Sequence, residues 1–300
     1  MKSQGGKAAF AFMMPALLIM GLILFFPIGY SFFLSVIDSN SFEFFTGQTK
    51  VVGGDNYVEL AKDASFWNSL LLHAVFIVAT TVVEVGLALV VAIYLDRVFP
   101  ISKAIQTFLI LPMFMIPVVS GLSFRFIFNP ESGVWGQVFY FFGKEAPDLL
   151  GDPFMAMGVV ILQDIWRMWP FLFLIIYAGL QAIPKELYEA MTMDGAKLQQ
   201  MIKYLIVPSI LPTLYIATIL KVIESLKAFT EIYVMTGGGP GESTSILSMY
   251  IVKQVTEFSK FGTGSAASLV LFFLAFGVTL VFSQLTKAKM RAPTVHSTVT

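Results

Sequence analysis

The side chains most able to act chemically are four charged residues within an otherwise apolar segment: Lys221, Glu224, Lys227 and Glu231. Their steps of three, three and four residues place them on one face of a helix, where the alternating charges can pair. Two interpretations stay open. The stripe either holds the helix against a neighbour, or it forms the polar wall of a water-filled cavity. We favour the cavity wall, because ionisable groups inside an apolar span by default mark a pathway or a pair.

A second polar group lies in the apolar segment 153–181, where Asp164 and Arg167 stand three residues apart and can pair. Trp166, Trp169 and Phe171 lie close to them in the sequence. Aromatic rings beside groups that hydrogen-bond to hydroxyls suit a sugar, whose C–H face stacks on the ring. Alternatively, the two tryptophans belong to an aromatic belt at the membrane interface.

Two further ionisable residues, Glu84 and His73, lie in the apolar segment 66–95. We interpret Glu84 as a buried, hydrogen-bonded structural residue in preference to a functional one. We interpret His73 as a helix histidine whose ring has a hydrogen-bond partner.

The composition excludes several classes of chemistry. The chain has no Cys and two widely separated His, which argues against a disulfide scaffold, a metal site and a Ser/His triad. We therefore expect no metal, no cofactor and no enzymatic activity. The 19 basic and 19 acidic residues balance, so no basic excess points to nucleic acid.

The elements that must carry these residues are membrane spans. The chain is 57% hydrophobic and 13% charged, whereas a soluble domain carries about 25% charged residues. Apolar runs long enough to cross a bilayer as helices occupy 8–37, 66–95, 104–124, 153–181, 206–235 and 262–286. The first run is too long for the apolar core of a signal peptide, so we expect it to stay as a span.

The distribution of Lys and Arg predicts the orientation of these six spans. With both ends of the chain in the cytoplasm, the inner segments 1–7, 96–103, 183–205 and 286–300 hold twice as many basic residues as the outer loops. The outer loops 38–65, 129–152 and 236–261 are too short for a catalytic domain. The fold class is therefore an all-α integral membrane protein with six transmembrane helices and cytoplasmic termini.

The inner segment 183–208 predicts a short helix–turn–helix. Pro184 suits the first turn of a helix, and Glu186 and Glu189 favour its N-terminal half. Gly195 suits a left-handed stop. A helix with an apolar edge that lies outside the membrane requires a groove on a partner.

This segment resembles the "EAA" loop of permease subunits of binding-protein-dependent ABC importers, which share a MetI-like transmembrane domain. The matching residues are Glu189-Ala190-Met191, Asp194-Gly195-Ala196 and Leu205-Ile206-Val207-Pro208, in which Met191, Leu205 and Val207 depart from the usual residues. The stretch Thr236–Pro240, followed by Ser243-Thr244, is similar to a motif of the carbohydrate-uptake branch.

The resemblance implies a division of labour. The loop would dock on a cytoplasmic ATPase through Glu189, Ala190, Asp194, Gly195 and Pro208. The chain would be one half of a permease heterodimer in the cell inner membrane. A homologous permease, two ATP-binding subunits and an external solute-binding protein would complete the importer. The transport core would span 66–285, preceded by the first helix and outer loop (1–65) and followed by a cytoplasmic tail (286–300).

The resemblance also implies where a sugar-like solute binds. The positions that match lie on the helices on either side of the loop and comprise Asp164, Arg167, Phe171, Lys221, Glu224, Ser225 and Ala228. Two cations in this set indicate an anionic or modified sugar. Glycerol phosphates and polyols stay open as alternatives within the same class. A proton-coupled secondary transporter, which also uses ionisable groups within the membrane, is the alternative outside it.

The glycine-rich stretch Gly237, Gly238, Gly239 and Pro240 lies in an outer loop. A nucleotide-binding loop needs a Lys after its last Gly, and Glu242 occupies that place here. We therefore expect these residues to form a tight turn that contacts the binding protein or caps the cavity.

Overall fold

A computed structural model of the chain describes residues 4–38, 49–98 and 103–290. Part of the predicted first outer loop, 39–48, and most of the predicted tail, 291–300, lie outside these residues, as do Lys2 and Arg291 from the count of basic residues. The chain divides into two compact units, residues 1–67 with 250–273 and residues 68–249 with 274–300.

The first unit contains α1 (Gln4–Ser35), the strands β1 (Ile37–Asp38) and β2 (Lys50–Val51), α3 (Asp55–Lys62) and the beginning of α14 (Phe261–Met290). The strands are antiparallel, with Ile37 opposite Val51. Asn56 of α3 links α1 to β1, since its side-chain amide donates to the carbonyl oxygens of Ser35 at 2.8 Å and Ile37 at 2.9 Å.

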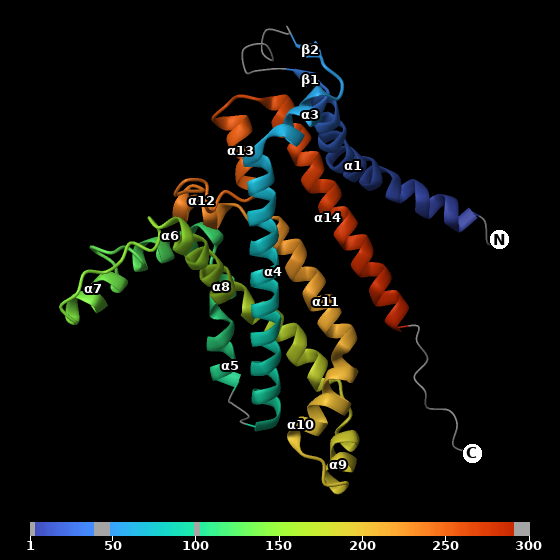
Figure 1. Cartoon of the computed structure of the whole chain (residues 1–300). Coiled ribbons are helices and arrows are strands. Elements are labelled where there is room, and N and C mark those ends of the chain that lie inside the picture. Colours follow the sequence, from blue (N-terminus) through green and yellow to red (C-terminus); the bar gives the residue numbers. More distant parts are fainter. Residues whose placement is uncertain (1–3, 39–48, 99–102, 291–300) are drawn as a thin grey trace. The chain divides into compact units, whose positions relative to one another are not determined.

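The second unit holds most of α4 (Ala64–Ile93), which continues into a π-turn at Tyr94–Val98. The helices that follow are α5 (Lys103–Ile110), α6 (Pro117–Ile127), α7 (Val134–Phe141), α8 (Pro153–Gln181), α9 (Lys185–Met193), α10 (Leu198–Met201), α11 (Val207–Leu226), α12 (Thr230–Thr236) and α13 (Leu247–Thr256), the last of which runs into the first unit. Within this unit, α9 and α10 lie beyond one end of α4, α8 and α11 (Figure 1).

The predicted spans correspond to five long apolar helices and one bent pair. The run 104–124 is not a single helix, and this prediction was wrong. The segments Gln106–Phe114 and Pro117–Ile127 meet at 99°. Pro112 and Pro117 explain the break, because proline cannot donate a backbone hydrogen bond and its ring excludes the preceding residue from helical geometry.

The predicted span 206–235 is also divided. α11 ends at Leu226 and α12 begins at Thr230. The hydroxyl of Ser248 donates to the carbonyl oxygen of Ala228, which the break leaves without a helical partner. Lys221 and Glu231 therefore lie on different helices, and the prediction of one continuous stripe was wrong.

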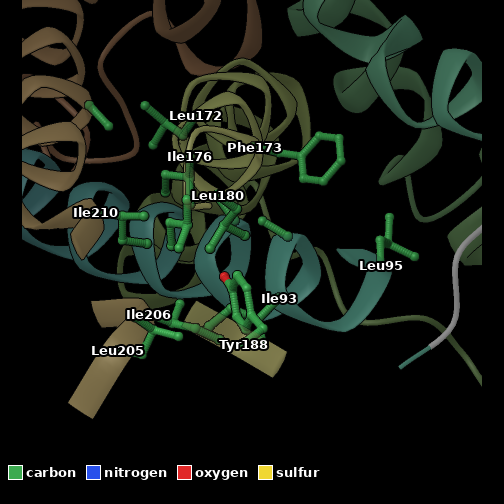
Figure 2. Packing of buried hydrophobic residues seen from close by; sticks show 14 residues of the cluster. Ile93, Leu95, Leu172, Phe173, Ile176, Leu180, Tyr188, Leu205, Ile206 and Ile210 are labelled. Carbon is green, nitrogen blue, oxygen red and sulfur yellow. The ribbon is translucent and has the colours of Figure 1, made fainter. Parts of the chain in front are cut away.

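An apolar cluster joins α9 to α4, α8 and α11, toward the ends of these three helices that lie nearest α9 (Figure 2). Leu172, Ile176 and Leu180 of α8 are each at most 1% exposed, and Ile210 of α11 packs in the same cluster. Tyr188 brings α9 into this cluster and is 6% exposed. The coupling loop predicted from the sequence is thus anchored to the spans.

α6 and α12 approach each other closely at Gly121. A Cβ at this position would lie 2.5 Å from Cγ2 of Val234 and 2.9 Å from the backbone oxygen of Glu231, both of which belong to α12. Only glycine leaves room for this contact.

We predict that Gly121→Ala lowers the stability of the protein by about 1–3 kcal/mol, because the added methyl group overpacks the contact. The measurement is the thermal unfolding midpoint in detergent. Gly86→Ala in α4 is the matched control, since a Cβ there meets nothing within 4 Å. An equal effect of the two substitutions would contradict the close packing.

Candidate functional site

A buried ion-pair cluster joins four helices of the second unit. At its centre, Nζ of Lys221 on α11 lies 2.5 Å from Oδ2 of Asp164 on α8 and 2.7 Å from Oε1 of Glu84 on α4. Lys221 is 1% exposed and Glu84 is fully buried. A lysine placed between two carboxylates keeps its charge away from water because both partners compensate for the lost hydration.

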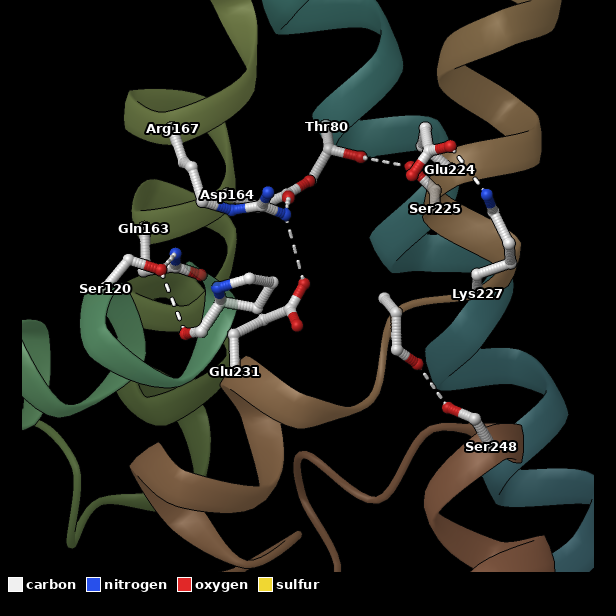
Figure 3. A network of polar contacts seen from close by, with 12 residues as sticks. Thr80, Ser120, Gln163, Asp164, Arg167, Glu224, Ser225, Lys227, Glu231 and Ser248 are labelled. Atoms are coloured by element: carbon white, nitrogen blue, oxygen red, sulfur yellow. Dashed lines mark hydrogen bonds and ion pairs between the residues drawn. The ribbon is translucent and has the colours of Figure 1, made fainter. Parts of the chain in front are cut away.

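Arg167 extends the cluster to α12. One guanidinium nitrogen lies 3.4 Å from Oδ1 of Asp164 and 3.3 Å from Oε1 of Glu231 (Figure 3). The order of contacts is therefore Glu84, Lys221, Asp164, Arg167, Glu231. We call these five residues the ion-pair cluster; it contains three carboxylates and two cations.

The sequence predicted part of this arrangement. The pairing of Asp164 with Arg167 is confirmed. Among the four charges around α11, however, only Lys227 and Glu224 pair with each other, at 2.6 Å, and their side chains are 62% and 47% exposed. Lys221 and Glu231 instead pair with residues of other helices.

Glu84 is the member of the ion-pair cluster whose partner the sequence did not indicate. It stands alone among apolar residues of α4, so no local spacing indicates its partner. Its burial was predicted, and the only available signal was the cost of an unpaired charge in an apolar helix. His73, on the same helix, has the hydrogen-bond partner that the sequence predicted for it, because Nε2 lies 3.1 Å from the carbonyl oxygen of Ser225.

The other predicted solute residues lie in different surroundings. Oγ of Ser225 is 3.4 Å from Oγ1 of Thr80, and the serine is 2% exposed. Ala228 is buried in an apolar cluster with Phe76 and Ile232. Phe171 packs, half-buried, on the apolar cluster near α9. The structure thus brings Asp164, Arg167 and Lys221 into contact, and leaves Glu224 exposed beside Lys227.

Gln163 adds a polar link between α8 and α6. Its amide donates to Oγ of Ser120 at 3.0 Å, and both residues are fully buried (Figure 3). Gln163 directly precedes Asp164 and lies one turn before Arg167, so this bond holds α8 against α6 at the level of both residues.

The predicted helix–turn–helix is present. α9 ends at Met193, and Gly195 adopts φ +73°, the left-handed geometry expected of the stop. The backbone N–H of Ala196 donates to the carbonyl oxygen of Met191 at 2.9 Å and closes the turn. Of the predicted docking residues, all are exposed: Glu189, Ala190, Asp194, Gly195 and Pro208.

The glycine-rich stretch forms a compact turn. Gly237 and Gly238 have φ of +62° and +88°, which glycine adopts without steric cost. The hydroxyl of Thr244 donates to the carbonyl oxygen of Gly239 at 2.8 Å, and it lies 2.7 Å from the hydroxyl of Thr236. Pro240 lines a shallow pocket of about 520 Å³ with Arg125 of α6 and Asp148.

Comparison with known proteins identifies the family. Residues 84–288 match the binding-protein-dependent transport system inner membrane component family. The chain belongs to this family. The match covers the ion-pair cluster, the helix–turn–helix and the glycine-rich turn, so all three features are parts of a transport subunit of the inner membrane.

Curated relatives extend over nearly the whole chain. The trehalose/maltose transport system permease protein of Thermococcus litoralis is 28% identical over 94% of this chain and 94% of its own length. The sulfoquinovosyl glycerol transport system permease protein of Agrobacterium fabrum is 32% identical over 92% of this chain and 89% of its own length. Both relatives are transport permeases.

A solved structure supports the fold. One chain of a bacterial alginate ABC transporter, crystallised with an alginate pentasaccharide-bound periplasmic protein, superposes with a TM-score of 0.81. It is 20% identical in sequence, and the superposition covers 95% of each chain. The all-α permease fold expected from the sequence is therefore confirmed, and the described residues supply five apolar helices and one bent pair for the six predicted spans.

We predict that Lys221→Met destabilises the protein by about 3–5 kcal/mol, because the substitution leaves Glu84 buried without its cation and Asp164 with Arg167 alone. Lys227→Met is the matched control and is expected to cost at most about 1 kcal/mol, since its pair is exposed. Thermal unfolding of both variants in detergent tests this. Similar losses at the two positions would show that the ion-pair cluster contributes no more than a surface pair.

Proposed function

We propose that the chain is one of two permease subunits of an ATP-driven importer, which moves a sugar-like solute from an external binding protein into the cytoplasm. The observation that carries the proposal is α9, an exposed helix with the family's loop motif, anchored to the spans inside the region that matches the family. In this proposal α9 and both chain termini lie in the cytoplasm. The transport core is residues 66–285.

The surface of α9 supports docking into a groove of an ATP-binding subunit. Leu187 is 46% exposed and Met193 is 87% exposed, and such apolar side chains at the edge of a helix favour a partner over water. Glu189 adds a charge that a basic residue of the partner can pair with. Two ATP-binding subunits hydrolyse ATP, and this chain converts their closure into rocking of the spans.

A neutral sugar is the solute that the ion-pair cluster supports best. Lys221 and Arg167 each contact two carboxylates, so neither cation of the cluster is left to attract an anionic solute. Two cations in the predicted solute set led us to expect an anionic or modified sugar, and the pairing of both removes that reason. Hydroxyl groups, in contrast, can hydrogen-bond to paired carboxylates and guanidinium groups without displacing them.

We keep the seven predicted positions as the proposed solute site and divide their roles by exposure. Glu224 is exposed and directly accessible, whereas Asp164, Arg167 and Lys221 shape the wall through their pairing. Phe171 offers a ring for stacking. Ser225 and Ala228 are buried and set the spacing between helices. The glycine-rich turn around Gly238 and Pro240 faces the binding protein.

We predict that Glu189→Lys abolishes uptake, because the reversed charge repels the basic groove on the ATP-binding subunit. Uptake and co-purification of the ATP-binding subunits, measured together, test this. Glu257→Lys is the control, since Glu257 is also exposed but lies outside α9. Normal uptake by the Glu189→Lys transporter would overturn the docking role of this loop.

We predict that uptake requires ATP and that a neutral disaccharide competes for it at least about tenfold better than glycerol 3-phosphate, the ratio expected from about 1.4 kcal/mol. Inside-out and right-side-out vesicles, energised either by ATP or by a proton gradient, distinguish an importer of this class from a secondary transporter. A preference for glycerol 3-phosphate over the disaccharide would show that the chain belongs to an importer of glycerol phosphates, the alternative within the same class.

Glu224→Ala is expected to weaken uptake while the transporter still assembles.

A further inference from the structure

The end of α4 nearest α9 carries a contact that no predicted site residue explains. The guanidinium group of Arg97 lies over the ring of Tyr188, 3.2 Å from its centroid. Arg97 belongs to the π-turn that ends α4, and Tyr188 belongs to α9, one residue before Glu189. A cation over an aromatic face is attracted by the electrons of the ring, most strongly when water is excluded.

Both partners of this contact are held in place. Tyr188 is 6% exposed, and burial raises the pKa of its hydroxyl, so that the phenol stays neutral. Nε of Arg97 lies 2.5 Å from Oδ2 of Asp96. Oδ1 of Asp96 accepts a hydrogen bond from the amide of Gln181 at 2.5 Å. α4, the end of α8 and α9 therefore meet at one point, which we call the α4–α9 junction: Asp96, Arg97, Gln181 and Tyr188.

The geometry of α4 links this junction to the ion-pair cluster. Glu84 and Arg97 stand 13 residues apart on one continuous helical segment, which corresponds to a rise of about 20 Å. Glu84 holds Lys221 of α11 at one point of α4, and Arg97 holds Tyr188 of α9 at the other. A helix packed in a protein interior transmits a displacement to its neighbours, because close-packed interiors have low compressibility.

We propose that Arg97 and Tyr188 are positioning residues that pass movement of α9 to α4, and through Glu84 to Lys221 and α11. The proposal rests on the proposed function, in which α9 docks on an ATP-binding subunit. The π-turn at Tyr94–Val98 favours this role, since such turns place a side chain out of the regular helical register and recur at functional sites.

The test measures movement directly in the assembled transporter. The chain contains no Cys, so Val82→Cys on α4 and Val138→Cys on α7, a helix that carries no member of the ion-pair cluster, introduce two unique, exposed positions for spin labels. The distance between the labels is measured without nucleotide and with ATP and vanadate. We expect a nucleotide-dependent change, and we expect Arg97→Ala and Tyr188→Leu each to reduce that change by at least about half while the complex still assembles.

Further variants separate the contact from general damage. Tyr188→Phe keeps the ring and is expected to retain the change. Arg97→Ala combined with Tyr188→Leu is expected to equal either single variant, because each removes the same contact. Tyr94→Leu on the same π-turn is the matched control, since Tyr94 is 50% exposed, and the change should persist. If Arg97→Ala prevents assembly, Arg97→Lys keeps the charge but loses the planar stacking surface, and the same direction is expected.

The outcomes distinguish this inference from the proposed function. Glu189→Lys should also abolish the nucleotide-dependent change. If Glu189→Lys leaves the change intact, the docking role of α9 fails. If Glu189→Lys abolishes it while Arg97→Ala and Tyr188→Leu retain it, movement reaches α4 by another route and this inference is overturned. A loss with Tyr188→Phe as large as with Tyr188→Leu, or no nucleotide-dependent change in the unsubstituted chain, overturns it as well.

Discussion

The structure of the second unit depends on the need to neutralise charge away from water. Five ionisable groups lie among apolar helices, and each has a partner of opposite charge on another helix or one turn away. Transferring a single such group from water to an apolar interior costs several kcal/mol, so α4, α8, α11 and α12 are constrained to keep these partners together. The apolar cluster between α4, α8, α9 and α11 adds packing energy. Apolar contacts are less directional than ion pairs, so this cluster fixes the rotation of each helix about its axis less sharply than the ion pairs do.

The sequence was sufficient for the number of apolar runs, their helical nature and the loop motif. These features depend on local composition and short spacing, as with Gly195, whose left-handed turn follows from its position after a helix. The pairing of Asp164 with Arg167 was equally local. Apolar length alone, however, predicts one straight helix for 104–124, because Pro112 and Pro117 change the direction of the chain without interrupting its hydropathy.

The rest required contacts between distant residues. Glu84 and Lys221 are 137 positions apart, and nothing near either of them indicates the other. The break after Leu226 likewise depends on Ser248, which supplies a donor from a later helix. The interpretation of Lys221 and Glu231 as one stripe assumed a continuous helix, and tertiary contacts decided otherwise. The contact of Arg97 with Tyr188 has no sequence pattern at all.

The missing Cβ at Gly121 has a mechanical consequence. Because position 121 carries no side chain, the backbones of α6 and α12 come within reach of each other, and a single methyl group there would collide with the backbone of Glu231. Each helix of this close pair is also tied to α8, α6 through the bond of Ser120 with Gln163 and α12 through the contact of Glu231 with Arg167. Separating the α6–α12 pair from α8 would therefore break both polar links at once.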